Sequence, residues 1–225
     1  MKQFTLPTLL CVLTLSFFSC STDNNDTTTE TTANTSNFQL KKSNKIDLAT
    51  AKQFYVDMMA TQEYTDYKSA LATFTGKLLL NEVRATNKAE WMSWINNNLN
   101  KTGFSSIAEF ETIYDDTTNK LSKMISANID LYDFIGNADL IQVGEVLEPE
   151  FANHTVDYPS NTDTCLDNCI DTTDAQLDEL ETQYTQNLQL AALSGDFGYT
   201  VAVEANYENA YIEIALDFNA CAGAC

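Results

Sequence analysis

Two cysteine pairs constrain the fold of this chain more than any other feature. Cys165 and Cys169 are four residues apart, and so are Cys221 and Cys225. A spacing of four places both members of a pair on one face of a helix. In an antiparallel helical hairpin Cys165 faces Cys225 and Cys169 faces Cys221. The spacing therefore predicts two disulfides that join two neighbouring helices.

The apolar residues between the cysteine pairs support the same register. When the chain reverses at Gly195, four pairs of apolar residues fall opposite one another: Leu177 with Ile214, Leu180 with Tyr211, Tyr184 with Tyr207, and Leu188 with Val203. Gly195 lies in the segment 193–198, whose two glycines are typical of a turn. Cysteine spacing, apolar face and turn thus agree on one helical hairpin over residues 165–225.

The start of the chain is typical of an export signal. Residues 6–18 form an apolar run that is too short to span a membrane as a helix. Residues 15–20, which read Leu-Ser-Phe-Phe-Ser-Cys, resemble a bacterial lipobox. The resemblance implies that residues 1–19 are a signal peptide and that Cys20 becomes lipidated. An ordinary secretory signal, cleaved nearby, is the alternative.

The residues after Cys20 indicate where such a lipoprotein is sorted. Ser21 stands where many inner-membrane lipoproteins have Asp, and this resemblance implies the outer membrane. The acidic stretch 21–26 resembles the surface-export signal of Bacteroidota lipoproteins. Residues 20–45 are expected to form a flexible tether, because their first part is rich in Thr, Asn and Asp and has little apolar surface to bury. We therefore expect a lipid anchor in the outer membrane, at the cell surface rather than on the periplasmic face.

Two other structures fit the cysteine-bearing segment. Four cysteines on facing helices are able to ligate zinc, and residues 212–218 alternate between apolar and polar side chains as a β-strand does. Export into an oxidising compartment favours disulfides over thiolates. The segment resembles twin CxxxC helical hairpins and the cysteine-bearing tails of some secreted Bacteroidota proteins. That resemblance implies no activity.

The rest of the chain is predicted to be helical. Apolar residues recur at helical spacing over residues 46–147. Two capping boxes, Asn87 with Glu90 and Ser106 with Glu109, mark helix starts. Residues 148–164 are polar and contain two prolines, so we expect a loop there. The predicted fold is all-α, with a helical bundle over 46–147, a loop over 148–164 and the hairpin packed on the bundle.

Composition excludes several classes of function. The chain has 32 acidic and 12 basic residues, a formal net charge of −20, which makes it a poor binder of nucleic acid. His154 is the only histidine, which excludes metalloprotease motifs and most histidine relays. We interpret His154 as a solvated loop residue and assign no catalytic role to the neighbouring Glu148 and Glu150. We predict no catalytic residue, no metal and no cofactor.

Trp91 and Trp94 are the candidate ligand-binding side chains. They lie three residues apart on a predicted helix beside apolar residues, so core packing is the expected role. The alternative is a pair of exposed indoles that stack on sugar rings. The leading hypothesis is a non-catalytic surface lipoprotein that binds an unknown protein or glycan. The alternatives are an enzyme or accessory subunit of an outer-membrane polysaccharide-handling system, and a small periplasmic inhibitor.

Overall fold

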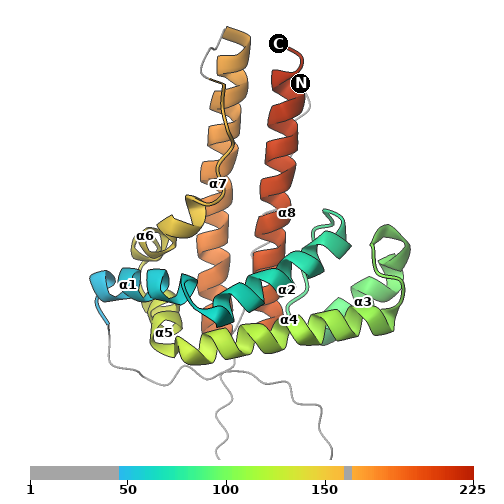
Figure 1. Cartoon of the computed structure of the whole chain (residues 1–225), viewed down its shortest axis with the longest axis vertical. Coiled ribbons are helices and arrows are strands. Elements are labelled where there is room, and N and C mark those ends of the chain that lie inside the picture. Colours follow the sequence, from blue (N-terminus) through green and yellow to red (C-terminus); the bar gives the residue numbers. More distant parts are fainter. Residues whose placement is uncertain (1–45, 160–163) are drawn as a thin grey trace, which may run out of the picture. The chain divides into compact units, whose positions relative to one another are not determined.

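The structure, a computed structural model, describes residues 46–159 and 164–225, which form helices and loops without any strand (Figure 1). The predicted all-α fold is confirmed. None of the described helices is both long enough and apolar enough to cross a membrane. Along the chain they are α1 (Leu48–Met59), α2 (Gln62–Leu78), α3 (Lys88–Asn98), the short 3-10 helix η1 (Leu99–Lys101), α4 (Ile107–Ala127), α5 (Ile129–Asn137), α6 (Leu140–Phe151), α7 (Thr164–Ser194) and α8 (Phe197–Ala222).

Helices α7 and α8 form a long antiparallel hairpin and run side by side in Figure 1. Gly195, in the turn between them, has a φ of 65°, a conformation that costs glycine little. Tyr184 and Tyr207 stack across the hairpin with ring centroids 4.2 Å apart, as the predicted register requires. The alternating segment 212–218 belongs to α8, so the alternative of a β-hairpin is wrong.

Two disulfides join the end of the hairpin opposite the turn. Cys165 is bonded to Cys225, and Cys169 is bonded to Cys221, with Cα atoms 5.7 and 5.9 Å apart. These are the two pairs that the hairpin register predicts. With all four sulfurs bonded in pairs, the structure has the disulfides and not the alternative zinc site. Thr173 lies inside the continuous α7 and donates its hydroxyl to the Cys169 carbonyl.

Helices α1 to α6 gather around the part of the hairpin near its turn (Figure 1). α5 and α6 pack on α7, while α2 and α4 pack on α8. Both predicted capping boxes begin helices: the amide of Glu90 donates to Asn87 Oδ1 at 3.0 Å, and that of Glu109 donates to Ser106 Oγ at 3.1 Å. Local capping thus sets where α3 and α4 start, and packing of α4 on α8 and of α3 on α4 holds them in place.

An aromatic cluster fills the space between α2, α3 and α4. Trp91 is completely buried, with its ring centroid 5.1 Å from that of Phe74 and 6.2 Å from that of Phe110. Its indole N–H donates to the carbonyl of Gly198 at the start of α8. Core packing, the expected role of Trp91, is therefore the one the structure shows.

Helix α6 extends beyond its predicted end. We expected a helix that stops before Pro149 and a loop from residue 148, but α6 continues to Phe151 with Pro149 inside it. An internal proline removes a backbone hydrogen bond and costs a helix about 3 kcal/mol. Burial of the last turn, where Leu147 and Glu150 are almost fully enclosed, outweighs that cost. The extra turn carries Glu150 into the interior.

Leu79 and Leu80, which follow α2, have positive φ angles of 53° and 62°. A left-handed backbone costs a residue with a β-carbon about 1–2 kcal/mol. Leu79 is 57% exposed, so its side chain gains little from burial. We expect Leu79→Gly to raise the free energy of unfolding by about 0.5–1 kcal/mol in urea denaturation.

The matched control for this prediction is Leu190→Gly. Leu190 is similarly exposed but lies within α7, where glycine lowers stability by about 1 kcal/mol relative to a good helix former. Substitution by glycine should therefore raise the free energy of unfolding at Leu79 and lower it at Leu190. A loss of stability at both positions would contradict the strain assigned to Leu79.

Candidate functional site

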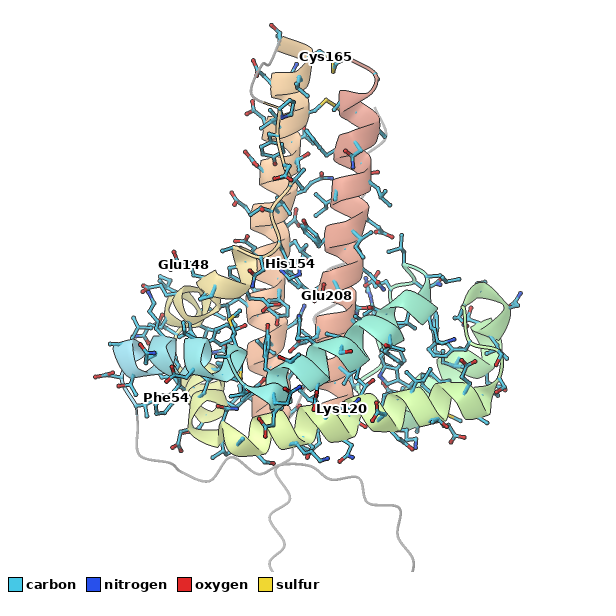
Figure 2. All side chains as sticks on the ribbon, viewed as in Figure 1. Phe54, Lys120, Glu148, His154, Cys165 and Glu208 are labelled. Carbon is cyan, nitrogen blue, oxygen red and sulfur yellow. A yellow bond between two sulfur atoms is a disulfide. The ribbon has the colours of Figure 1, made fainter. Side chains whose placement is uncertain are left out.

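Five ionisable side chains meet where α2, α6 and α8 come together. They come from α2, from the end of α6 and the residues just after it, and from two successive turns of α8; Figure 2 labels His154 and Glu208 at this junction. We call this set the charged cluster: Lys68, Glu150, His154, Glu204 and Glu208.

Lys68 lies at the centre of the charged cluster. Its ammonium group donates to Glu150 Oε1 at 2.9 Å and to Glu208 Oε1 at 2.7 Å, and lies 4.0 Å from Glu204 Oε2. Burial lowers the pKa of Lys68, but the negative charges of Glu204, Glu150 and Glu208 outweigh burial and raise the pKa above its ordinary value. Lys68 therefore stays charged at every physiological pH.

Glu150 is the most buried acid of the cluster, with 3% of its surface exposed. Its Oε2 accepts hydrogen bonds from the hydroxyls of Tyr64 at 2.9 Å and Tyr55 at 3.3 Å, while its Oε1 accepts from Lys68. α1 and α2 supply these donors, so three helices converge on one carboxylate. Such pairing is what makes a buried carboxylate tolerable.

His154 is not the solvated loop residue that we expected; its side chain is only 11% exposed. Its Nδ1 lies 2.9 Å from the backbone carbonyl of Glu150, and its Nε2 lies 3.1 Å from Glu208 Oε2. The rings of Tyr207 and Tyr211 each lie 4.9 Å from the imidazole. The loop prediction failed because these partners belong to α8, more than 50 residues away in the sequence.

The two nitrogens of His154 have different roles. A carbonyl oxygen only accepts hydrogen bonds, so Nδ1 carries a proton and donates to Glu150. Burial lowers the pKa of His154, but the hydrogen bond to Glu208 and the one to the Glu150 carbonyl raise it above its ordinary value. The imidazole is therefore held in one orientation, with Nε2 directed at Glu208.

Glu204 and Glu208, one turn apart on α8, differ in their environments. Burial raises the pKa of Glu204 to about 7, although the charge of Lys68 opposes this rise. Burial also acts on Glu208, but the hydrogen bond from His154 and the charge of Lys68 outweigh it and hold that pKa at about 2. At neutral pH Glu208 is ionised and Glu204 is close to its midpoint.

Tyr67 adds a buried polar group beside the cluster. It is fully buried, and its hydroxyl makes no hydrogen bond among the described residues. Burial raises the pKa of Tyr67, and the charges of Glu204, Glu208 and Glu150 raise it further. An unpaired buried hydroxyl costs about 1–3 kcal/mol, so its position calls for an explanation.

A second candidate site is a hollow of about 640 Å³ between residues 80–86, α7 and α8. Its lining mixes tyrosine rings with amide side chains and includes Arg84, Tyr184, Asn187, Tyr199, Asn206 and Tyr207. Asn206 fixes one wall: its amide accepts from the Val83 N–H at 3.1 Å and donates to the Val83 carbonyl at 2.8 Å. The wall is therefore held through main-chain atoms.

The tryptophan pair is not a ligand platform. Trp91 has no exposed surface from which to stack on a sugar, so that hypothesis is wrong for it. Trp94 is half-buried and packs against the core from the outside. Cys20, the predicted lipidation site, lies outside the described residues. The pair of exposed, stacking indoles that the sequence allowed is thus not present on α3.

The residues of the charged cluster are marked in the sequence by charges that interrupt apolar helix faces. Lys68 lies four residues after Tyr64 and three before Leu71, on the apolar face of α2. Glu204 lies three residues after Val201 and Glu208 three after Ala205, and both of these apolar residues are buried. Charged residues at positions where the helical period predicts apolar ones mark a buried polar site.

No known protein family, curated protein or solved structure matches this chain.

We expect stability to fall as the pH rises past neutrality. A group whose pKa is higher in the folded state contributes stability that is complete below its ordinary pKa and is lost above its folded pKa. Glu204 and His154 are both of this kind. Glu208 is the opposite case and loses its contribution only as the pH falls toward 2. The free energy of unfolding should therefore be higher at pH 5 than at pH 8.5.

Glu204→Gln should remove most of this dependence. The Glu204 carboxyl alone accounts for about 2–3 kcal/mol between pH 5 and pH 8.5. The measurement is urea denaturation at both values with a chelator present. Glu213→Gln, at an exposed site on the same helix, removes one charge and should keep the wild-type dependence. An unchanged pH dependence in Glu204→Gln would refute the assignment.

Proposed function

We propose that this protein is a non-catalytic binding lipoprotein of the outer membrane. In this proposal Cys20 carries the lipid, residues 20–45 are the tether, and the helical part is displayed at the cell surface. The lipobox-like end of the apolar run supports the anchor. The two disulfides support export, because disulfides persist in oxidising compartments and are rare in the cytosol.

The observation that carries the binding role is the hollow of about 640 Å³ beside the hairpin. Its volume is in the range of ligand-binding sites, and aromatic rings with amide groups suit a glycan or a peptide through stacking and hydrogen bonds. The charged cluster, by contrast, pairs its acids and bases with one another in the interior. The hollow is therefore the surface on which we place the ligand.

The location is tested by protease shaving of intact cells. The chain should disappear while a periplasmic marker protein stays whole. Cys20→Ala should abolish labelling with a radioactive fatty acid and release the chain from the membrane fraction. Survival of the chain in shaved cells, or fatty-acid labelling of Cys20→Ala, would overturn the proposed location or anchor.

The binding role is tested with a photo-crosslinking amino acid placed at Asn187, an exposed residue on the rim of the hollow. Irradiated cells should give a discrete adduct. The matched position is Lys123, an exposed residue of α4 that does not line the hollow. Equal adducts from both positions, or none from Asn187, would contradict a ligand in the hollow.

The polysaccharide-handling alternative loses its only support in the chain. It depended on Trp91 and Trp94 as an exposed pair, and Trp91 is buried. No feature of the described residues favours it over the binding role.

A further inference from the structure

We propose that Glu150, His154 and Glu208 form a binding site for one divalent transition-metal ion of the Zn²⁺ or Mn²⁺ class. This inference goes beyond the proposed function and does not depend on the lipid anchor or on the hollow. It reverses our expectation from the sequence that the chain holds no metal. It is carried by the geometry of three side chains, by the groups that orient them and by the balance of charge around them.

The three donor atoms already lie close together. One atom from each residue falls within 4.8 Å of the others, and His154 Nε2 is 3.1 Å from Glu208 Oε2. Zinc ligands lie about 2.0–2.2 Å from the ion, so donors that share one ion are about 3–4 Å apart. The Glu150 carboxylate, whose Oε1 lies 4.0 Å from Nδ1 of His154, has to turn toward Nε2 for the three donors to share one ion.

The surrounding groups orient the donor atoms by hydrogen bonds, as the neighbours of metal ligands do in metal sites. A metal-bound histidine usually donates its other ring N–H to a carbonyl or a carboxylate. His154 does so through Nδ1 to the Glu150 carbonyl, which leaves Nε2 for the ion. The carboxylates are oriented as well, because Tyr64 and Lys68 donate to Glu150, and Lys68 donates to Glu208.

The charge of the site fits a divalent ion. When Nε2 serves as a ligand the imidazole is neutral, and Glu150, Glu204 and Glu208 then face the single positive charge of Lys68. The excess is two negative charges, which one divalent cation neutralises.

A separate observation concerns a buried hydroxyl on α2. Tyr67 is fully buried, has no hydrogen-bond partner among the described residues, and lies within the electrostatic reach of Glu204, Glu208 and Glu150. A buried hydroxyl of this kind commonly binds a water molecule. The side chains of Lys68 and Glu208 are 24% and 23% exposed, which leaves an ion a route from solvent.

The donor set decides the class of ion. One imidazole nitrogen with two carboxylates suits Zn²⁺, Mn²⁺ or Fe²⁺, whereas Ca²⁺ prefers six to eight oxygen ligands. The site offers too few oxygens for Ca²⁺ and no sulfur for a soft ion. Zn²⁺ and Mn²⁺ are therefore the probes, and Ca²⁺ is the control ion.

The experiment is titration calorimetry of Zn²⁺, Mn²⁺ and Ca²⁺ into the purified full-length protein, chelator-treated and kept oxidised. We expect one Zn²⁺ per chain, and a Kd at least tenfold weaker in His154→Gln and in Glu208→Gln. Asp217→Asn, at an exposed site on α8, is the matched control because it removes one charge outside the cluster and should bind as wild type does.

A second measurement uses only wild-type protein, so it tests the proposal even if a cluster variant fails to fold. Because His154 is the only histidine, wild-type protein labelled with ¹⁵N-histidine gives one pair of imidazole nitrogen signals. Zn²⁺ should shift the Nε2 signal far more than the Nδ1 signal. The proposal is overturned if Zn²⁺ does not bind, if it binds without moving Nε2, or if Asp217→Asn weakens binding as much as His154→Gln.

Discussion

Lys68→Met should lower the free energy of unfolding by about 3–5 kcal/mol at pH 7.5, because it leaves buried carboxylates without their central cation. Lys68 is hydrogen-bonded to Glu150 and Glu208 at once. Methionine has a similar length and keeps most of the apolar contacts, so the loss measures the charge. Urea denaturation followed by circular dichroism gives the value.

Lys52→Met is the matched control. Lys52 pairs with Glu145 at 2.9 Å, but both side chains are at least 40% exposed, so that pair contributes less than about 1 kcal/mol. If Lys68→Met costs no more than Lys52→Met, the buried cluster is not held together by Lys68.

A double substitution tests whether Lys68 compensates the negative charge of Glu204. In Lys68→Met with Glu204→Gln, the neutral amide removes one of the acids that the ammonium compensates. The loss for the pair should be smaller than the sum of the two single losses by about 1 kcal/mol or more. Simple additivity would show that Lys68 and Glu204 act independently despite their 4.0 Å separation.

With the Cys165–Cys225 disulfide intact, replacing Cys169 and Cys221 by alanine should lower the free energy of unfolding by only about 2–3 kcal/mol, because the remaining bond still closes nearly the same loop. The Cys169–Cys221 disulfide closes a loop with a sequence separation of 52, and the chain-entropy model gives about 4 kcal/mol for such a loop only when no other bond closes it. The Cys165–Cys225 disulfide closes nearly the same loop, with a separation of 60, and should have a similar effect when removed alone. Denaturation under non-reducing conditions measures both.

Removing both disulfides should cost about 6–7 kcal/mol, which is more than the two single losses added together. Either bond alone already restricts the unfolded loop, so the second adds only a short further constraint. Wild-type protein reduced with dithiothreitol should match the fourfold alanine variant, which controls for the lost side chains. Full additivity of the two pairs would contradict the loop-entropy explanation.

The sequence predicted the structure correctly wherever a short pattern has a single structural meaning. A cysteine spacing of four, an apolar face and a glycine turn agree on one register, and the hairpin and both disulfide pairs follow from it. The capping boxes at Asn87 and Ser106 act between residues three apart, so they too are visible without tertiary information.

The charged cluster was missed because its meaning depends on tertiary contacts. Lys68 and Glu150 are 82 residues apart, and Lys68 and Glu208 are 140 apart, so no local window joins them. Pro149 made the end of α6 resemble a loop, which left His154 classified as solvated. Helix periodicity predicts which face is buried, but not that a buried face will hold charges.

The hydrogen bonds between Asn206 and Val83 determine which sequence changes the wall of the hollow can tolerate. Its amide binds only main-chain atoms of Val83, and residues 82, 84 and 86 of that extended segment are exposed while Val83 and Ala85 are buried. The exposed side chains can therefore be exchanged without loosening the wall of the hollow. Closely related chains can keep one pocket shape and still differ in the chemistry they present at its rim.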